Sequence, residues 1–265
     1  MRPQLVAFAA EMPGGLARSD QRAKGELYLR RLLLEGKRKS MQPMAARLGI
    51  DHQPPQQFVT SSTWDYAQVR GRLAGWAAEF IDPRAYVVDD TGFPKDGLDS
   101  PGVARMYSGS LGKVSDCQIG VSVHAVTDWA SAAIDWRLFL PTSWNDTAAE
   151  HNTGHADDPE TRAQIRARRA RSRIPEHVRH EEKWRQALDM LDEITGPQEI
   201  NGEPAGGWGL APLPVVAGAG YGDATEFRLG LEDRGSSYVV AVKATTSAYP
   251  ADAEPATPPY GGRGP

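Results

Sequence analysis

Two adjacent carboxylates, Asp89 and Asp90, follow a short apolar run, Ala85 to Val88, that is typical of a buried strand. Mg²⁺ prefers hard oxygen ligands, and two such ions about 4 Å apart can promote cleavage of a phosphodiester. Successive strand residues point to opposite faces, so both acids can line one site only if the strand has already ended. The pair therefore has two interpretations. One is a metal ligand with a supporting hydrogen-bonding partner, and the other is simple strand termination.

A second candidate is basic. The segment from Arg162 to Arg173 holds six arginines and no acid. Arginines that neutralise phosphates release counterions and give affinity for nucleic acid of any sequence. The DNA-binding hypothesis rests on five of them: Arg166, Arg168, Arg169, Arg171 and Arg173. The alternative, a solvated arginine-rich helix or loop, has equal weight.

Two histidines, His151 and His155, precede Asp157 and Asp158 and raise the possibility of zinc. Histidines four residues apart indicate a metal site only on a helix, and Gly154 interrupts this one. A solvated polar loop is the favoured interpretation. The single cysteine, Cys117, falls on the apolar phase of its strand and is predicted to pack in the core.

The chain before residue 82 is predicted to form a helical domain, residues 1–82. The segment Trp64 to Phe80 shows helical spacing of its apolar residues, which predicts one inward-facing stripe. That stripe consists of Tyr66, Val69, Leu73, Trp76 and Phe80.

From residue 83 to 247 the pattern predicts an α/β core. A strand at 85–88 is followed by a loop from Thr91 to about Gly102 and a hairpin of two alternating strands, 117–127 and 134–140. The second hairpin strand should place Ile134, Trp136, Leu138 and Leu140 on one face. A helix near 184–191, a strand at 213–217, a helix begun and capped by Asp223 and a strand at 238–242 complete the order. A helix between the last two strands implies that they are parallel. The tail, 248–265, is rich in proline and glycine and is predicted to be disordered.

Composition and charge bear on three classes of protein: nucleic-acid-binding, disulfide-bonded and membrane proteins. The formal net charge is −4 and the sequence pI is about 5.9, which counts mildly against nucleic-acid binding. One cysteine allows no internal disulfide and favours a reducing, cytoplasmic location. The first twelve residues lack the pattern of a signal peptide, and no apolar run is long enough for a membrane span, so no membrane partner is expected.

The run Val87 to Lys95, with Asp-Asp-Thr-Gly at its centre, resembles the first catalytic motif of insertion-sequence transposases of the family conventionally numbered 701. The likeness covers most of residues 20–250. It continues through five further segments: Gly102 to Gly109, Cys117 to Val121, Leu138 to Trp144, Ala219 to Gly222, and Tyr238 to Val242.

The resemblance implies an RNase H-like core whose Asp-Asp-Glu triad holds Mg²⁺ for DNA cleavage and strand transfer. It implies DNA as a partner and allows a homo-oligomer. The first aspartate maps to Asp90, in preference to Asp89. The second maps to Gly218, which has no carboxylate and is expected at the end of a strand that lies adjacent and parallel to the first. The glutamate is expected on a late helix, past Pro265. Asp223 is a possible substitute for the second acid, but a helix-capping role is favoured.

The sequence thus predicts a truncated, degenerate transposase that no longer cuts DNA. A rival hypothesis is a non-catalytic DNA-binding or regulatory protein that occupies transposon ends or forms mixed oligomers. A third is an unrelated, acquired role.

Overall fold

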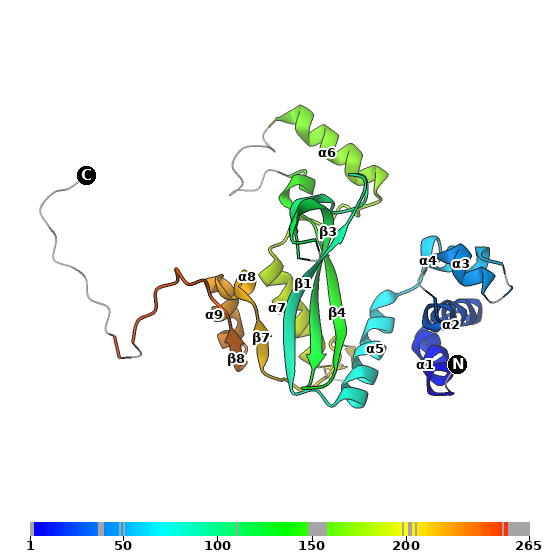
Figure 1. Ribbon diagram of the computed structural model, residues 1–265, viewed down its shortest axis with the longest axis horizontal. Helices are drawn as coiled ribbons and strands as arrows, with labels where there is room; N and C mark the ends of the chain where they lie inside the picture. The colour runs from blue at the N-terminus through cyan, green and yellow to red at the C-terminus, as the bar shows by residue number, and fades with distance from the viewer. Residues whose placement is uncertain are drawn as a thin grey trace, which may run out of the picture.

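The computed structural model describes residues 3–36, 40–47, 49, 51–109, 111–147, 158–197, 199–200, 203–204, 206–250 and 252–253. His151, His155 and Asp157, and most of the predicted disordered tail, lie outside these ranges. Figure 1 shows a central sheet, with α1 to α4 gathered beside it and α6 above it. The N-terminal helices are α1 (Pro3–Glu11), η1 (Met12–Gly15), α2 (Ser19–Leu33), α3 (Met41–Ala46), α4 (Gln53–Thr60) and α5 (Tyr66–Ile81).

The main sheet is mixed and has six strands: β1 (Ala85–Pro94), β2 (Ala104–Ser108), β3 (Lys113–Val126), β4 (Ser131–Phe139), β7 (Val215–Ala217) and β8 (Tyr238–Val240). β1 pairs antiparallel with β3 and parallel with β7, and β7 pairs parallel with β8. The later helices are η2 (Thr142–Trp144), α6 (Pro159–Arg171), α7 (Lys183–Thr195), α8 (Ala219–Gly222) and α9 (Thr225–Asp233). A separate two-stranded sheet joins β5 (Glu199–Ile200) and β6 (Glu203–Pro204). The α/β fold class is confirmed, and the order of the predicted elements is that of an RNase H-like core.

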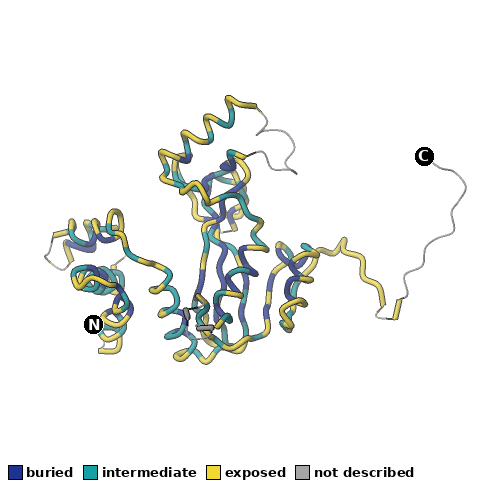
Figure 2. The backbone as a smooth tube through the Cα atoms, turned by 180° about the vertical axis from the view of Figure 1, so that it is seen from behind, coloured by how far each residue is buried: buried dark blue, intermediate teal, exposed yellow. Residues whose placement is uncertain are grey.

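Helices cover one face of this sheet and create the main core. Every second residue of β1 and β3 is buried there, for example Tyr86, Val88, Val121 and Val123. They pack against Ala74 and Ala77 of α5 and against apolar residues of α7 and α9, namely Leu188, Leu191, Ile194, Phe227 and Leu231. Figure 2 shows the buried backbone concentrated along these strands. All five alternating residues predicted from Cys117 to Ala125 are buried, Cys117 included.

The opposite face of the sheet is more open. Val216 and Val239, from β7 and β8, are 36% and 70% exposed, although their strand neighbours Val215 and Ala217 are buried. The two faces therefore offer different environments to any side chain on β1, and strand phase alone decides which environment each acid meets.

β1 is longer than predicted. The expected strand ends at Val88 and is followed by a loop from Thr91, but ten residues of β1 pair with β3 as far as Pro94 opposite Cys117. That loop prediction was wrong at its start. Part of it is also a strand, β2, which pairs with the outer part of β3. Gly92 allows the close approach, because a Cβ there would meet the backbone and side chain of Ser108 at 3.1 Å.

A β-bulge in β4 overturns the predicted inward face of that strand. Val123 pairs with Asp135 and His124 with Ala133, so Ile134 is the extra residue. Ile134 and Asp135 are consequently both fully buried, whereas Trp136 and Leu138 are 46% and 45% exposed.

The predicted inner stripe of α5 was also wrong at both ends. Tyr66 and Phe80 are 65% and 76% exposed, and the helix buries small residues, Ala74 and Ala77, against the sheet. Phe80 instead stacks on Trp76, which contacts Phe8 of α1. In the part of the chain that is described, no helix combines the length and apolar character that a membrane crossing needs.

Candidate functional site

Asp90 lies on the helix-covered face of β1, in phase with Tyr86 and Val88. Its carboxylate faces the first residue of α7, Lys183, and Asp90 Oδ2 lies 2.5 Å from Lys183 Nζ. Both side chains keep about a third of their surface exposed, at 30% and 32%. The ammonium group also lies 5.3 Å from the centre of the Phe139 ring. Asp90 is thus already engaged by a cation of the chain itself.

Asp89 points to the other, open face. Because β1 continues unbroken through both acids, their side chains alternate and cannot converge on one point. Asp89 Oδ1 accepts a hydrogen bond from the backbone N–H of Asp90 at 2.8 Å. Its backbone carbonyl accepts one from Ser122 Oγ at 3.3 Å. These contacts are consistent with a local structural role for Asp89.

Gly218 follows β7 directly, beside the two acids. In the parallel register, Val88 pairs with Ala217, so Gly218 comes one residue after a paired position, just as Asp89 does. Adjacent parallel placement of these two strands is what the resemblance implies, and it is confirmed. A Cβ at Gly218 would meet no atom within 4 Å. The position therefore has room for a side chain but supplies no ligand.

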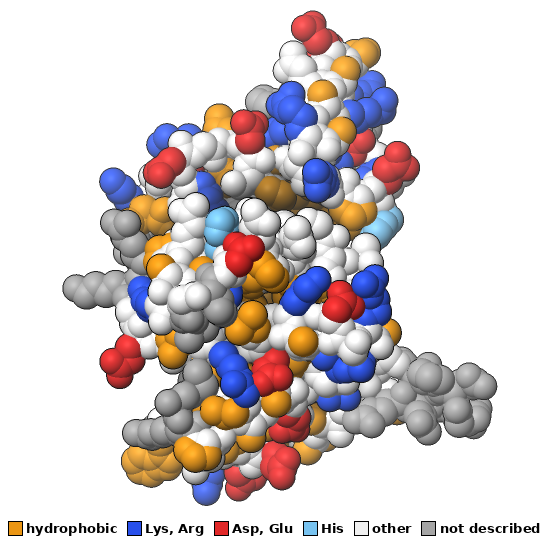
Figure 3. All heavy atoms as spheres, turned by 90° about the vertical axis from the view of Figure 1, so that its right-hand side faces the viewer, with side chains coloured by type: hydrophobic (Ala, Val, Ile, Leu, Met, Phe, Trp, Pro, Cys, Tyr) orange, Lys and Arg blue, Asp and Glu red, His pale blue; other side chains and the backbone are white. Residues whose placement is uncertain are grey.

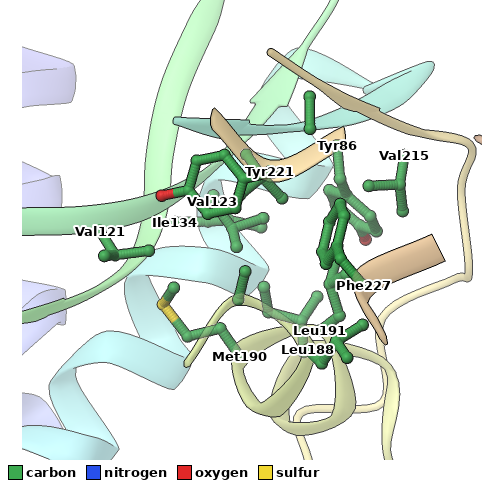
Figure 4. Close-up of a cluster of buried hydrophobic side chains, with 14 of the residues drawn as sticks. Tyr86, Val121, Val123, Ile134, Leu188, Met190, Leu191, Val215, Tyr221 and Phe227 are labelled. Atoms are coloured by element: carbon green, nitrogen blue, oxygen red, sulfur yellow. The ribbon is translucent and has the colours of Figure 1, made fainter. Parts of the chain in front are cut away.

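Tyr221, on α8, completes the surroundings of Asp90. Its ring is buried and its hydroxyl has no hydrogen-bond partner among the described residues. Burial, and then the negative charges of Asp90 and Asp89, raise the pKa of the Tyr221 hydroxyl far above its ordinary value. Figure 4 shows this residue among the buried apolar side chains of the covered face. The hydroxyl therefore stays protonated and remains able to donate a hydrogen bond.

This donor set does not fit a two-metal centre. A pair of Mg²⁺ ions needs several carboxylates aimed at one point. Here the Asp90 carboxylate is paired with Lys183, and the Asp89 carboxylate lies on the opposite face of the sheet. The position of the expected second aspartate is Gly218. Across the residues that the structure describes, no group of three or more His, Cys, Asp or Glu side chains could hold a metal ion.

Asp223 has a different role from the predicted helix cap. The N-cap of α9 is Ala224, and it makes no side-chain capping bond. Asp223 instead accepts a hydrogen bond from the backbone N–H of Lys243 at 2.8 Å and pairs with the ammonium of Lys243, also at 2.8 Å. Both oxygens of its carboxylate are thus engaged by Lys243, so Asp223 secures the segment after β8.

The arginine segment lies on α6, which Asp158 caps, except for Arg173, which follows the end of the helix, and the five candidate arginines divide into two groups. Arg169 is 5% exposed and donates to the carbonyls of Trp144, Pro175 and Val178. Arg168 lies 3.6 Å above the Trp144 ring and donates to two carbonyls of the 98–103 loop. Both hold α6 onto the core.

The other three arginines of the candidate set, Arg166, Arg171 and Arg173, are exposed. Among the described residues, Arg166 and Arg171 make long ion pairs, to Asp146 at 3.4 Å and to Asp99 at 3.9 Å. Figure 3 shows basic side chains on both sides of the protruding upper part of the molecule, where α6 lies. The free basic surface is therefore smaller than the sequence suggested.

Sequence reasoning missed Lys183. It lies 93 residues from Asp90 along the chain, and no local spacing connects the two. The one available signal was a lysine in the first turn of a helix, where the helix dipole disfavours positive charge and an external anion is needed. Tyr221 was part of the Gly-Tyr-Gly segment, but that segment alone assigned it no role.

Two comparisons with known proteins agree with this fold. A family described as "DDE superfamily endonuclease" matches residues 11–265. A probable transposase for insertion sequence element IS701 from Microchaete diplosiphon is 31% identical over 93 residues. That match covers 34% of this chain and 24% of the relative, so it spans about a quarter of the relative's length. The family match extends over nearly the whole sequence, and the chain therefore belongs to the DDE superfamily of endonucleases.

Proposed function

We propose that this chain is a DNA-binding protein derived from an insertion-sequence transposase, and that it does not itself cut or join DNA strands. The observation that carries the proposal is the arrangement at the two positions of the expected aspartates. Asp90 is paired with Lys183, and its neighbour Asp89 faces the opposite side of the sheet. Gly218, at the second position, has no carboxylate. Two-metal cleavage of a phosphodiester depends on carboxylates that converge.

The DNA-binding part of the proposal rests on family membership and on the exposed arginines of α6. Arg166 and Arg171 extend from the protruding helix α6 and Arg173 follows its end, so all three can reach a phosphate backbone without disturbing the core. The overall charge of −4 limits this contribution, so binding should be weak, independent of sequence and strongly dependent on salt.

Cleavage and binding can be tested on the same preparation. Supercoiled plasmid is incubated with the chain and with Mg²⁺ or Mn²⁺, and no nicking above the level of the Asp90→Ala variant is expected. Metal-dependent nicking that Asp90→Ala abolishes would contradict the proposal and would mean that another carboxylate completes the site.

Binding is measured as log K against log salt. Changing Arg166, Arg171 and Arg173 together to Gln should lower the slope by up to about 2.7, at about 0.9 for each phosphate that the variant no longer neutralises. A matched control changes three exposed arginines elsewhere, Arg18, Arg72 and Arg84, to Gln. An equal fall in slope for both variants would show that α6 is only a solvated surface.

A further inference from the structure

A groove of about 840 Å³ lies beside β4, and its lining includes neither Asp90 nor any residue of α6. Among the described strands β4 pairs with β3 alone, so it is an edge strand. The other walls of the groove come from α5, from α7 and from the segment 177–181. Small-molecule sites in proteins have volumes of roughly 300–1,000 Å³, and this groove falls within that range.

Two exposed aromatic rings flank the groove, and one of them is free. The side chains of Tyr66 and Trp136 are 65% and 46% exposed. The Tyr66 ring already carries the guanidinium of Arg70, 5.5 Å from its centre. Among the described residues, by contrast, neither an aromatic ring nor a cation lies on the indole of Trp136. Trp136 therefore offers a planar surface on which another flat ring can stack.

A buried acceptor without a partner belongs to the same lining. Gln186, on α7, is 6% exposed, and its side-chain oxygen Oε1 accepts no hydrogen bond within the described part of the chain. A buried acceptor is costly to leave unpaired, and native structures leave few of them so. Its position beside a groove points to a ligand that supplies the missing N–H donor.

The groove also carries an excess of positive charge, because its lining holds three arginines and two glutamates. Glu193 is held between two of these arginines, Arg70 at 3.1 Å and Arg137 at 2.7 Å. The third, Arg179, lies 3.8 Å from Asp146, a carboxylate that also lies within 4 Å of Arg166 and Arg169. One carboxylate thus balances three guanidinium groups, and Arg179 keeps the capacity to bind an anion such as phosphate.

We propose that this groove binds a nucleotide whose base is unpaired, with the base stacked on Trp136, an N–H of its edge donating to Gln186 Oε1 and its phosphate on Arg179. A flat ring, an N–H donor and an anion are the three features that the lining requires, and a nucleotide combines them. A base inside a duplex cannot enter, because its neighbours cover both of its faces. The inference goes beyond the proposed binding of DNA through α6 and does not depend on it.

The test measures the affinity of the whole chain by isothermal titration calorimetry for deoxyadenosine monophosphate and for 2-deoxyribose 5-phosphate, which has no base. The nucleotide should bind more tightly. Trp136→Ala should weaken its binding roughly 5- to 150-fold, the range for loss of one base–aromatic stack. Gln186→Met keeps a buried side chain of similar size and should weaken binding roughly 2- to 12-fold, the loss of one hydrogen bond.

A matched control is a second exposed tryptophan of the same hairpin. Trp129, in the turn between β3 and β4, is 91% exposed and does not line the groove. Trp129→Ala should therefore bind the nucleotide as the wild type does. If Gln186→Met does not fold, the comparison of Trp136→Ala with Trp129→Ala still decides, because both substitutions are at exposed positions.

The source of the nucleotide is distinguished with a short single strand of oligodeoxyadenylate and with the same strand paired to oligothymidylate. A single strand that binds far more tightly than the mononucleotide indicates single-stranded DNA, and similar Kd values indicate a free nucleotide. In either case Trp136→Ala should weaken binding of the single strand. Binding of the paired strand should be unchanged by Trp136→Ala.

The inference is overturned if the nucleotide and the single strand bind no better than the sugar phosphate. It is also overturned if Trp136→Ala binds them as the wild type does, or if Trp129→Ala weakens binding as much as Trp136→Ala. Failure of the proposed function would appear elsewhere, as nicking of plasmid or as a salt dependence of duplex binding that the α6 arginines do not affect.

Discussion

Two ion pairs on the covered face of the sheet differ in how far water reaches them. Asp90 and Lys183 keep about a third of their side-chain surface exposed. Asp135 is completely buried, and its partner Arg70, from α5, is 12% exposed. Arg70 also binds Glu193 of α7 at 3.1 Å, and Glu193 in turn binds Arg137 of β4 at 2.7 Å. One pair stands alone at the sheet surface, and the other belongs to a four-residue network that joins α5, β4 and α7.

The carboxylate in the family motif, Asp90, and the buried carboxylate on which stability depends, Asp135, therefore belong to different ion pairs. Burial raises the pKa of Asp135 to about 6, and the charge of Arg70 only partly opposes that effect. Removing the Asp135 carboxylate from water costs free energy, which the charge of Arg70 must offset. The desolvation cost for Asp90 is small, because water still solvates its carboxylate. We expect stability to depend strongly on Asp135 and Arg70, and weakly on Asp90 and Lys183.

The greatest loss of stability is expected for Arg70→Met. Removing the arginine leaves the Asp135 carboxylate buried without its partner, which typically costs about 3–5 kcal/mol. The free energy of unfolding, measured by urea denaturation at about neutral pH, should fall by that amount. The double variant Arg70→Met/Asp135→Asn should recover much of the loss, because no charge then remains to be solvated. A loss below about 1 kcal/mol for Arg70→Met, the range of an exposed ion pair, would mean that the two pairs are energetically alike.

A smaller effect is expected from pH. The folded-state pKa of Asp135, about 6, lies above the ordinary value of 3.8, so the folded protein binds this proton more tightly than the unfolded chain. The contribution of Asp135 to stability should therefore decrease as the pH rises from about 4 to about 6, and level off above that. At about 1.36 kcal/mol for each pKa unit, the change is roughly 2–3 kcal/mol.

The measurement is the difference in unfolding free energy between the wild type and Asp135→Asn at each pH. Acids with lowered pKa values, such as Asp158 and Asp223, give the opposite trend, and the subtraction cancels them. A difference that stays flat between about pH 4 and about pH 6.5 would contradict the burial argument for Asp135.

How much of this could be predicted depends on how local each signal is. The placement of Asp90 on the first core strand and of Gly218 after its parallel neighbour followed from apolar runs and motif resemblance, and both are where the sequence indicated. The extent of β1 was not predictable in the same way. Gly92 and Pro94 are typical of a loop, and only pairing with the long β3 keeps them extended.

Asp135 was missed for a related reason. Strict alternation along 134–140 assigned it to the outer face, and a β-bulge at Ile134 turns it inward. A bulge with no glycine has no residue signature of its own, so the phase of β4 after Ile134 depends on its partner strand. Lys183 was missed because its partner lies 93 residues away. Both omissions concern contacts between elements, whereas the successful predictions concern patterns within one element.

The least change in stability should come from Lys183→Met in buffer without divalent ions. Its carboxylate partner is solvated and the lysine stem is only partly covered, so the pair resembles an exposed salt bridge, worth about 0.2–1 kcal/mol. Added salt should reduce even this difference, because the Debye length falls to about 3 Å at about 1 M. Urea denaturation of wild type and variant at low and high NaCl gives both numbers. A loss of about 3 kcal/mol or more, unchanged by salt, would mean that Asp90 is as dependent on its cation as Asp135 is. The lysine would then be a structural element of the core, and the contrast between the two ion pairs would no longer hold.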